Sequence, residues 1–198
     1  MFLIRGRIYG WPRECYSGLS PYYHNGLGNI YSDLDNTDEA ISEYKKAIEL
    51  DPKDATSHNN LGYLYLISEN LEEAQIYFEK AIILDPDDYV AKINIGITYF
   101  KLGKNDEAKL HFQSMLEKCP TTSAFERLTK ITALLGLEKS EEALSLFHQT
   151  CEQFEITPWQ KDAFLKCWNM LATSTHPPLF VNEFLKKAKA IFSSKTGK

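Results

Sequence analysis

The chain has 198 residues, of which 43% are hydrophobic and 25% charged, and its formal net charge is −5. This composition predicts one folded domain, and the lack of an apolar run of about 18 residues excludes a membrane-spanning helix. Residues 1–20 hold three Arg and one Glu, and residues 182–198 hold five Lys and one Glu, which leaves 14 basic and 25 acidic side chains between them. This acidic body argues against nucleic acid as a ligand, because phosphate contacts need clustered Lys and Arg.

Residues 1–20 show neither helical periodicity nor the long apolar stretch of a signal peptide. We expect them to form an irregular N-terminal extension; the alternative is that the chain is a fragment of a larger protein. The four cysteines lack the Cys-x-x-Cys spacing of a redox or zinc motif, and they are Cys15, Cys119, Cys151 and Cys167. They indicate reduced, mostly buried thiols in a cytoplasmic protein.

From residue 21 to residue 122 one sequence pattern recurs with a period of 34 residues, which is typical of stacked helical repeats. Each unit holds an apolar residue followed by Gly, then an aromatic residue, an Ala, a second aromatic residue and a Pro. The aligned residues are Leu27-Gly28, Leu61-Gly62 and Ile95-Gly96; Tyr31, Tyr65 and Tyr99; Ala40, Ala74 and Ala108; Tyr44, Phe78 and Phe112; and Pro52, Pro86 and Pro120. A Gly inside a helix costs about 1 kcal/mol relative to Ala, so Gly in register indicates close packing between two helices.

Acidic pairs open the second half of each unit, at residues 38–39, 72–73 and 106–107. Carboxylates are favoured in the first turn of a helix by about 0.3–1 kcal/mol each, so these pairs indicate helix starts rather than catalytic acids. The whole pattern closely resembles the tetratricopeptide repeat, a pair of antiparallel helices. This resemblance implies an all-α, right-handed superhelical helix-turn-helix solenoid, with units at residues 21–54, 55–88 and 89–122.

A degenerate fourth unit is expected at residues 123–156. Glu141-Glu142-Ala143 and Phe147 follow the pattern one residue late, but Lys130-Ile131 stands where the apolar–Gly pair belongs. We therefore expect the two helices of this unit to splay or rotate, with Gly136 ending the first of them.

Residues 157–198 are expected to form C-terminal capping helices, because a repeat array needs a terminal element with one polar face. Thr157-Pro158 predicts the start of a helix that runs to about Ala172, with Thr as the N-cap. A last helix is expected over about 179–192, where apolar residues alternate with Lys. The alternative for this lysine-rich helix is docking to a membrane surface or to a partner.

In tetratricopeptide proteins the first helices of successive units line a concave groove, which binds an extended peptide or a partner helix. By this resemblance the groove residues of the chain are Tyr22, Asn25, Asn29, Asn59, Asn60, Tyr63, Ile67, Ile93, Asn94, Ile97, Phe100 and Lys101. Asn60 and Asn94 lie one repeat apart and resemble the asparagine ladder that holds peptide backbones, since an amide offers both a donor and an acceptor. The alternative is that they are merely polar groove residues or make bonds on the helix surface.

The pattern departs from that of the family members that bind chaperones. Asn29 and Asn60 match the asparagines of their carboxylate clamp, but Asn25, Val90 and Asn94 stand where the basic clamp residues belong. Because such a clamp needs charge-assisted donors, we do not expect a chaperone tail as the ligand. The mixture of amides with aromatic and apolar residues predicts a partly apolar peptide or an amphipathic helix.

Nothing in the sequence predicts catalysis or a cofactor, because it holds no Gly-rich phosphate loop, nucleophile elbow or metal-spaced set of His and Glu. His24 and His58 are aligned one repeat apart on the helix-packing face, where packing is expected rather than metal binding. The sequence therefore predicts a protein–protein interaction scaffold or adaptor that binds a protein or peptide partner. The alternatives are a regulatory or scaffolding segment of a larger multidomain enzyme or receptor, and a module with weak self-association.

Overall fold

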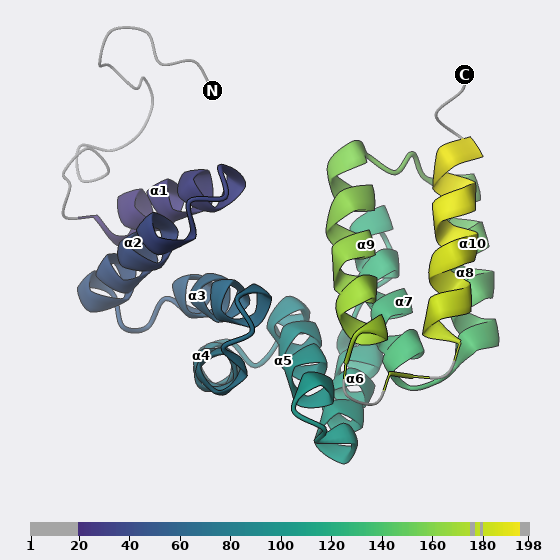
Figure 1. Cartoon of the computed structure of the whole chain (residues 1–198), viewed down its shortest axis with the longest axis horizontal. Helices are drawn as coiled ribbons and strands as arrows, with labels where there is room; N and C mark the ends of the chain where they lie inside the picture. The colour runs from purple at the N-terminus through teal and green to yellow at the C-terminus, as the bar shows by residue number, and fades with distance from the viewer. Residues whose placement is uncertain (1–19, 175–176, 179, 195–198) are drawn as a thin grey trace, which may run out of the picture.

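The computed structural model describes residues 20–174, 177–178 and 180–194. Within these residues the chain is entirely helical, with no β-strand, which confirms the predicted all-α fold (Figure 1). The helices are α1 (Pro21–Asp33), α2 (Thr37–Leu50), α3 (Ala55–Ile67), α4 (Leu71–Leu84), α5 (Tyr89–Lys101), α6 (Asn105–Lys118), α7 (Ala124–Gly136), α8 (Ser140–Gln153), α9 (Pro158–Ala172) and α10 (Val181–Ser194). In this part of the chain, no helix is long and apolar enough to cross a membrane.

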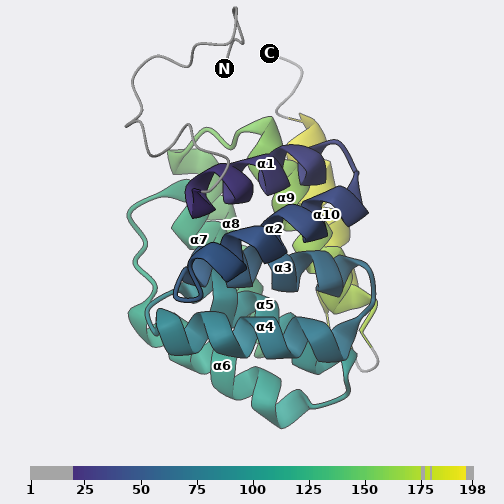
Figure 2. The same ribbon diagram turned by 90° about the vertical axis from the view of Figure 1, so that its left-hand side faces the viewer.

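Consecutive helices pack as pairs, and the pairs follow one another along a curved solenoid. Figure 2 shows the α1–α2 pair stacked on the α3–α4 pair, with α5 and α6 continuing the stack. The first helices of the pairs lie on the inner side of the curve, where α9 also lies (Figure 1). This is the helical solenoid that the 34-residue period predicts.

Local capping explains where several helices begin. The Asp54 carboxylate accepts hydrogen bonds from the backbone N–H groups of Thr56 and Ser57 at the start of α3, and Asp88 does the same at the start of α5. Thr157 forms a capping box with Gln160, so α9 begins where the sequence predicts. The last helix is displaced by two residues at each end from the expected 179–192.

A residue in the left-handed conformation follows the first helix of each of the four regular and degenerate units. These residues are Asp35, Glu69, Gly103 and Glu138, with φ of 57°, 60°, 76° and 61°. The backbone N–H of the residue that follows donates a hydrogen bond to the carbonyl oxygen five residues earlier, as from Asn36 to Tyr31 at 2.9 Å. This hydrogen bond is typical of helix C-termini. Only Gly103 adopts this conformation without a steric cost.

The recurring spacing of Gly and aromatic residues serves the packing of the two helices in each unit, as predicted. A Cβ atom on Gly28 would lie 2.6 Å from Tyr44, one on Gly62 would lie 2.9 Å from Phe78, and one on Gly96 would lie 2.6 Å from Phe112. Close approach of the two helices in each regular unit therefore requires Gly at these positions.

Gly136 ends α7 as predicted, but its packing role lies between units rather than within one. A Cβ atom on Gly136 would overlap the ring of Phe112, on the edge opposite to the one that Gly96 contacts. The fourth unit thus has no Gly at Ile131, which is buried, and instead admits an aromatic ring of the third unit.

The buried core is uneven along the solenoid. One continuous cluster extends from Leu66 to Phe192, and Trp168 of α9 is its largest fully buried side chain. A second, small cluster of Ala40, Tyr44, Leu61 and Leu64 holds the first two pairs together. At the other end the apolar side chains of α10 are buried against the core while its lysines are exposed, so α10 caps the array.

Candidate functional site: the concave face

The predicted groove residues of α1 and α3 lie together and are accessible to different degrees. We call this surface the α1–α3 face, and it consists of Tyr22, Asn25, Asn29, Asn59, Asn60, Tyr63 and Ile67. Tyr22 is 70% exposed and Ile67 is 45% exposed, which is unusual for large apolar side chains. The asparagines lie between them and are exposed or half-buried.

The predicted groove does not continue as an accessible surface over α5. Ile93, Asn94, Ile97 and Phe100 are at most 8% exposed. Both α7 and α9 pack against α5, so the groove residues of the third unit form part of the core. The predicted groove residues of the third unit are therefore mostly covered, because the solenoid curves enough for α9 to pack on α5. The predicted residues that stay accessible are mainly those of α1 and α3.

Helix α9 is held in this place by a buried aromatic residue. Trp168 has no exposed surface, and its indole Nε1–H donates a hydrogen bond to the Thr132 hydroxyl of α7 at 2.9 Å. The ring of Trp168 also meets Phe147 and Phe184 edge to face. A buried indole with a satisfied N–H contributes a large apolar area and fixes one orientation.

The exposed side of α9 faces the α1–α3 face and adds charged groups to it. Asp162 and Lys166 form an ion pair at 3.0 Å on α9. Burial raises the pKa of Tyr63, Cys167 and Asp162 raise it further, and Lys166 lowers it. Asp162 raises the pKa of Lys166, and Tyr63 and Asp35 add to this effect. The charges of α9 therefore act on Tyr63 of α3, although α9 packs against α5, α7 and α10.

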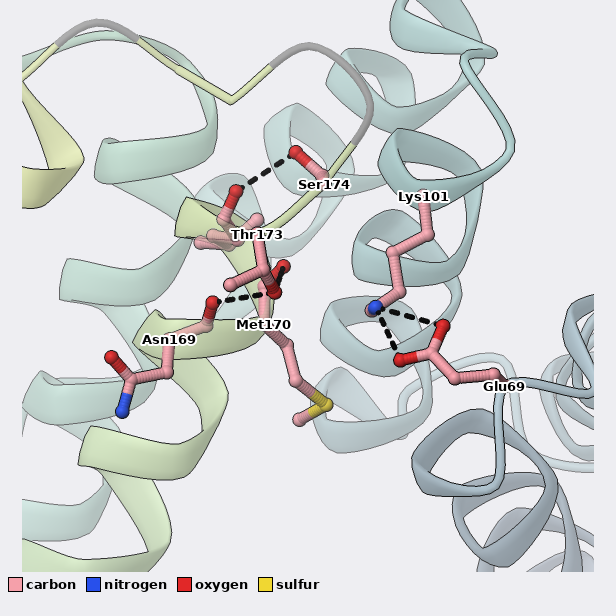
Figure 3. A network of polar contacts seen from close by, with 7 residues as sticks. Glu69, Lys101, Asn169, Met170, Thr173 and Ser174 are labelled. Carbon is pink, nitrogen blue, oxygen red and sulfur yellow. Dashed lines mark hydrogen bonds and ion pairs between the residues drawn. The ribbon is translucent and has the colours of Figure 1, made fainter.

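Lys101, a predicted groove residue, is engaged with an acid of the preceding unit. Its Nζ donates to both carboxylate oxygens of Glu69, at 2.9 and 3.1 Å, and the lysine side chain is 8% exposed (Figure 3). Figure 3 also shows Met170 of α9 pointing toward this pair. Lys101 therefore ties the end of α5 to the turn between α3 and α4.

The predicted asparagines bond to one another across neighbouring helices. Asn60 donates to the Asn29 carbonyl oxygen at 3.2 Å, and Asn94 donates to that of Asn59 at 3.1 Å. Asn25 donates to the Ser57 hydroxyl at 2.7 Å. The structure thus places a row of amides across α1, α3 and α5, in which most partners are other side chains of the row.

One buried tyrosine orients this row. The Tyr44 hydroxyl of α2 donates to the Asn29 carbonyl oxygen at 2.7 Å, so this oxygen accepts two bonds and its amide is fixed. Among the described residues, the carbonyl oxygen of Asn60 has no hydrogen-bond donor, and neither N–H of the Asn59 amide has an acceptor. An acceptor on Asn60 and a donor on Asn59 thus have no partner among the described residues.

The two aligned histidines are buried between helices, as the packing interpretation predicts. The Nδ1 atom of His24 lies 2.6 Å from the Glu43 carboxylate, and the Nε2 atom of His58 lies 3.1 Å from the Pro52 carbonyl oxygen. Burial alone raises the pKa of Glu43, but the bonds with Lys46 and His24 hold it below its ordinary value. Within the described ranges, no three His, Cys, Asp or Glu side chains are grouped as metal ligands.

Cys119 and Cys167 form no disulfide and are poorly suited to nucleophilic chemistry. Burial raises the pKa of Cys119 to about 11 and that of Cys167 to about 12. Since the thiolate is the reactive form, these residues are inert near neutral pH. Cys15, the fourth of the cysteines expected to be reduced, lies outside the described residues.

Sequence reasoning missed two regions near the predicted groove, namely α9 and the turn between α3 and α4. Asp162, Lys166 and Met170 of α9, and Glu69 of the turn, were not expected there. The spacing of these residues does not predict that they lie near the groove. By contrast, the residue types of Ile93, Ile97 and Phe100 could have indicated that α5 is covered. An all-apolar row in the third unit, beside amides in the first two, is typical of a covered surface.

Comparison with known proteins agrees with this fold. Models of the TPR repeat match residues 28–67, and models of the tetratricopeptide repeat match residues 55–88 and 91–122. No curated protein sequence gives a significant match to the chain.

Several solved structures are similar. The first TPR of Spaghetti (RPAP3) bound to the HSP90 peptide SRMEEVD is 25% identical with a TM-score of 0.55, over 64% of this chain and 94% of that one. The TPR domain of Arabidopsis OM64 is 20% identical with a TM-score of 0.54, over 62% and 95%.

YrrB, described as a TPR protein with an unusual peptide-binding site, is 22% identical with a TM-score of 0.52. This similarity covers 91% of the chain and 94% of YrrB, so the shared fold extends beyond the three regular units. With the 34-residue period, the paired helices and the three family matches in agreement, the chain is a tetratricopeptide repeat protein.

Proposed function

We propose that the chain is a protein-interaction module that binds an extended, partly apolar segment of a partner protein on the α1–α3 face. The observation that carries this proposal is the row of amides, which leaves a donor on Asn59 and an acceptor on Asn60. Two exposed apolar side chains, Tyr22 and Ile67, flank the row. A backbone grip beside apolar contacts is how repeat surfaces hold extended peptides.

The amides suit a peptide backbone because they are already oriented. Asn29 is fixed by Tyr44 at 2.7 Å, and Asn60 is fixed by Asn29 at 3.2 Å. A ligand therefore loses little binding free energy in ordering these side chains. Each hydrogen bond formed to an amide contributes about 0.5–1.5 kcal/mol.

An extended segment fits this surface better than a helix does. A partner helix needs a continuous apolar groove, and the apolar groove residues of α5 are buried beneath α9. The accessible α1–α3 face consists mainly of asparagine side chains, with Tyr22 and Ile67 exposed on either side of them. Extended backbone exposes the N–H and C=O groups that such a surface can bind.

The acidic peptide bound by the similar Spaghetti domain does not suit this chain. Asn25 is bonded to Ser57, and Asn94 is buried and bonded to Asn59, where basic clamp residues would be needed. Lys101 is held by Glu69. The body of the chain is also acidic, so an acidic peptide would meet repulsion.

Peptides selected from a random library on the wild-type chain test the proposal. The variant Tyr22→Ala/Asn60→Ala removes one exposed apolar group and one amide of the α1–α3 face. Its affinity for the selected peptides is expected to fall by about tenfold or more, as one to two lost contacts of 0.5–1.5 kcal/mol imply. Fluorescence polarisation measures the affinity, and circular dichroism should show unchanged helicity.

The matched control is Ile83→Ala/Asn70→Ala, which alters an exposed apolar residue of α4 and the exposed amide at its N-cap, whose side chain makes no capping hydrogen bond. It should bind the peptides as the wild type does. The HSP90 peptide SRMEEVD should not compete with them. Equal affinity of the two double variants would contradict the proposed site.

A further inference from the structure

The outer face of α1 is uncovered at positions that are buried in the next two units. Tyr23 and Ile30 are each 43% exposed. One repeat later the same positions are Ser57 and Leu64, and their exposed fractions are 0% and 1%. The corresponding residues of α5, Ala91 and Thr98, are also fully buried.

The reason is that each later first helix is covered by the preceding unit. Leu61 and Leu64 of α3 pack with Ala40 and Tyr44 of α2, and α4 covers α5 in the same way. Helix α1 has no such neighbour among the described helices (Figures 1 and 2). Its uncovered apolar row, which we call the α1 outer face, consists of Tyr23, Leu27, Ile30 and Leu34 at helical spacing.

We propose that residues 1–19 dock on the α1 outer face and complete the first unit in the way that a preceding repeat completes the others. This inference is independent of the proposed function, because it concerns the opposite side of α1 from Asn25 and Asn29. The segment joins α1 directly through Ser20, the N-cap of that helix. It is therefore tethered beside the face that needs covering.

The length and composition of the segment fit this role. The 13 residues of α1 extend about 20 Å, a distance that about six or seven extended residues cover. Nineteen residues are thus more than sufficient. The segment also supplies large apolar side chains, namely Phe2, Leu3, Ile4, Ile8, Tyr9 and Trp11.

Charge favours this segment over a second copy of the chain. Residues 1–19 carry Arg5, Arg7 and Arg13, and no further Arg or Lys occurs before Lys45. The end of α1 and the start of α2 carry exposed acids, namely Asp33, Asp35, Asp38 and Glu39. The segment therefore complements the acidic end of α1, whereas two α1 outer faces would bring like charges together.

Hydrogen exchange of the α1 amides tests the proposal. In a chain that lacks residues 2–14, these amides should exchange about tenfold faster or more, as expected when the burial of about two methylene groups is lost. Adding a synthetic peptide of residues 1–19 should slow them again. The triple variant Arg5→Glu/Arg7→Glu/Arg13→Glu in the full chain should also speed exchange of the α1 amides. It changes none of the described residues.

A matched pair of variants separates docking from a general loss of stability. Ile30→Ser lies on the α1 outer face, and Ile83→Ser is an exposed control on α4. In the full chain Ile30→Ser should speed α1 exchange and Ile83→Ser should not. In the shortened chain Ile30→Ser should have little further effect, because the contact is already absent.

Two results would overturn the proposal. One is α1 exchange that is the same with and without residues 2–14 and with the arginines reversed. The other is a dimer in light scattering whose dissociation, rather than loss of the segment, speeds α1 exchange; this would assign the face to a second copy.

Discussion

Phe112 of α6 lies between two glycines that belong to different units. Gly96 of its own unit contacts one edge of the ring, and Gly136 at the end of α7 contacts the other. Gly26 of α1 is the opposite case, since a Cβ atom there would have no neighbour within 4 Å. The sequence predicted the first contact from the period and could not predict the second, because Gly136 lies outside the repeated positions.

The two environments predict opposite effects of adding one methyl group. Gly136→Ala should lower the free energy of unfolding by about 1–3 kcal/mol, because the ring of Phe112 has no room to move. Gly26→Ala should raise it by about 0.5–1 kcal/mol through helix propensity alone. Urea denaturation followed by circular dichroism measures both, and destabilisation by Gly26→Ala would contradict the open space found at that residue.

Tyr44 couples the core of the first unit to the row of amides. Burial raises its pKa to about 12, and Asp33 adds to this effect. The ordinary value of 10.0 applies in the unfolded chain, so tyrosinate forms there at lower pH than in the folded chain. The contribution of Tyr44 to stability is therefore complete below pH 10 and is lost as the pH rises toward 12.

Tyr44→Phe should make unfolding less dependent on pH in this alkaline range. The wild type should lose roughly 1–2 kcal/mol more than the variant on going from pH 10 to pH 12. Denaturation at several pH values measures the difference, and subtraction cancels the titration of the lysines. Parallel pH curves for the two proteins would show that burial does not perturb this hydroxyl.

At the scale of single helices, the ends that carry side-chain caps were predicted most closely. Thr157 and Pro158 located the start of α9 because their chemistry is local. Where α9 packs is not local, and the sequence predicted only that it would cap the array. Its attachment to α7 depends on Trp168, whose hydrogen-bond partner Thr132 is 36 residues away.

The two tryptophans of α9 allow the contribution of its packing to stability to be tested. Trp168 is fully buried, whereas Trp159 is 66% exposed and stacks on Phe125. Trp168→Ala should cost about 3–5 kcal/mol and should speed hydrogen exchange in α5, α7 and α9. Exchange in α1 and α2 should stay unchanged, because repeats contact mainly their neighbours.

Trp159→Ala is the control and should change the stability by less than about 1 kcal/mol. Mass spectrometry of exchanged peptides resolves the individual helices. Faster exchange throughout the chain in Trp168→Ala would mean that the whole solenoid unfolds as one unit.

At the scale of the whole molecule, the period predicted the helices but not the shape they make together. The path of a solenoid is set by a small rotation at each unit, and the sequence pattern does not encode that angle directly. The cumulative curvature brings α9 over Ile93, Ile97 and Phe100, which were expected to line an accessible groove. The predicted residues of α1 and α3 are not covered in this way, because along the curve they lie farther from α9 than α5 does.

The small cluster of Ala40, Tyr44, Leu61 and Leu64 has a consequence for how a partner would be sensed. It supports the α1–α3 face with far fewer buried side chains than the cluster around Trp168 supports α9. Among the described residues we therefore expect the proposed binding surface to lie at the less stable end, where local opening is easier. A bound partner would stabilise the first two helix pairs against local opening. Binding would therefore reduce the flexibility of one end of the solenoid and leave the other end unchanged.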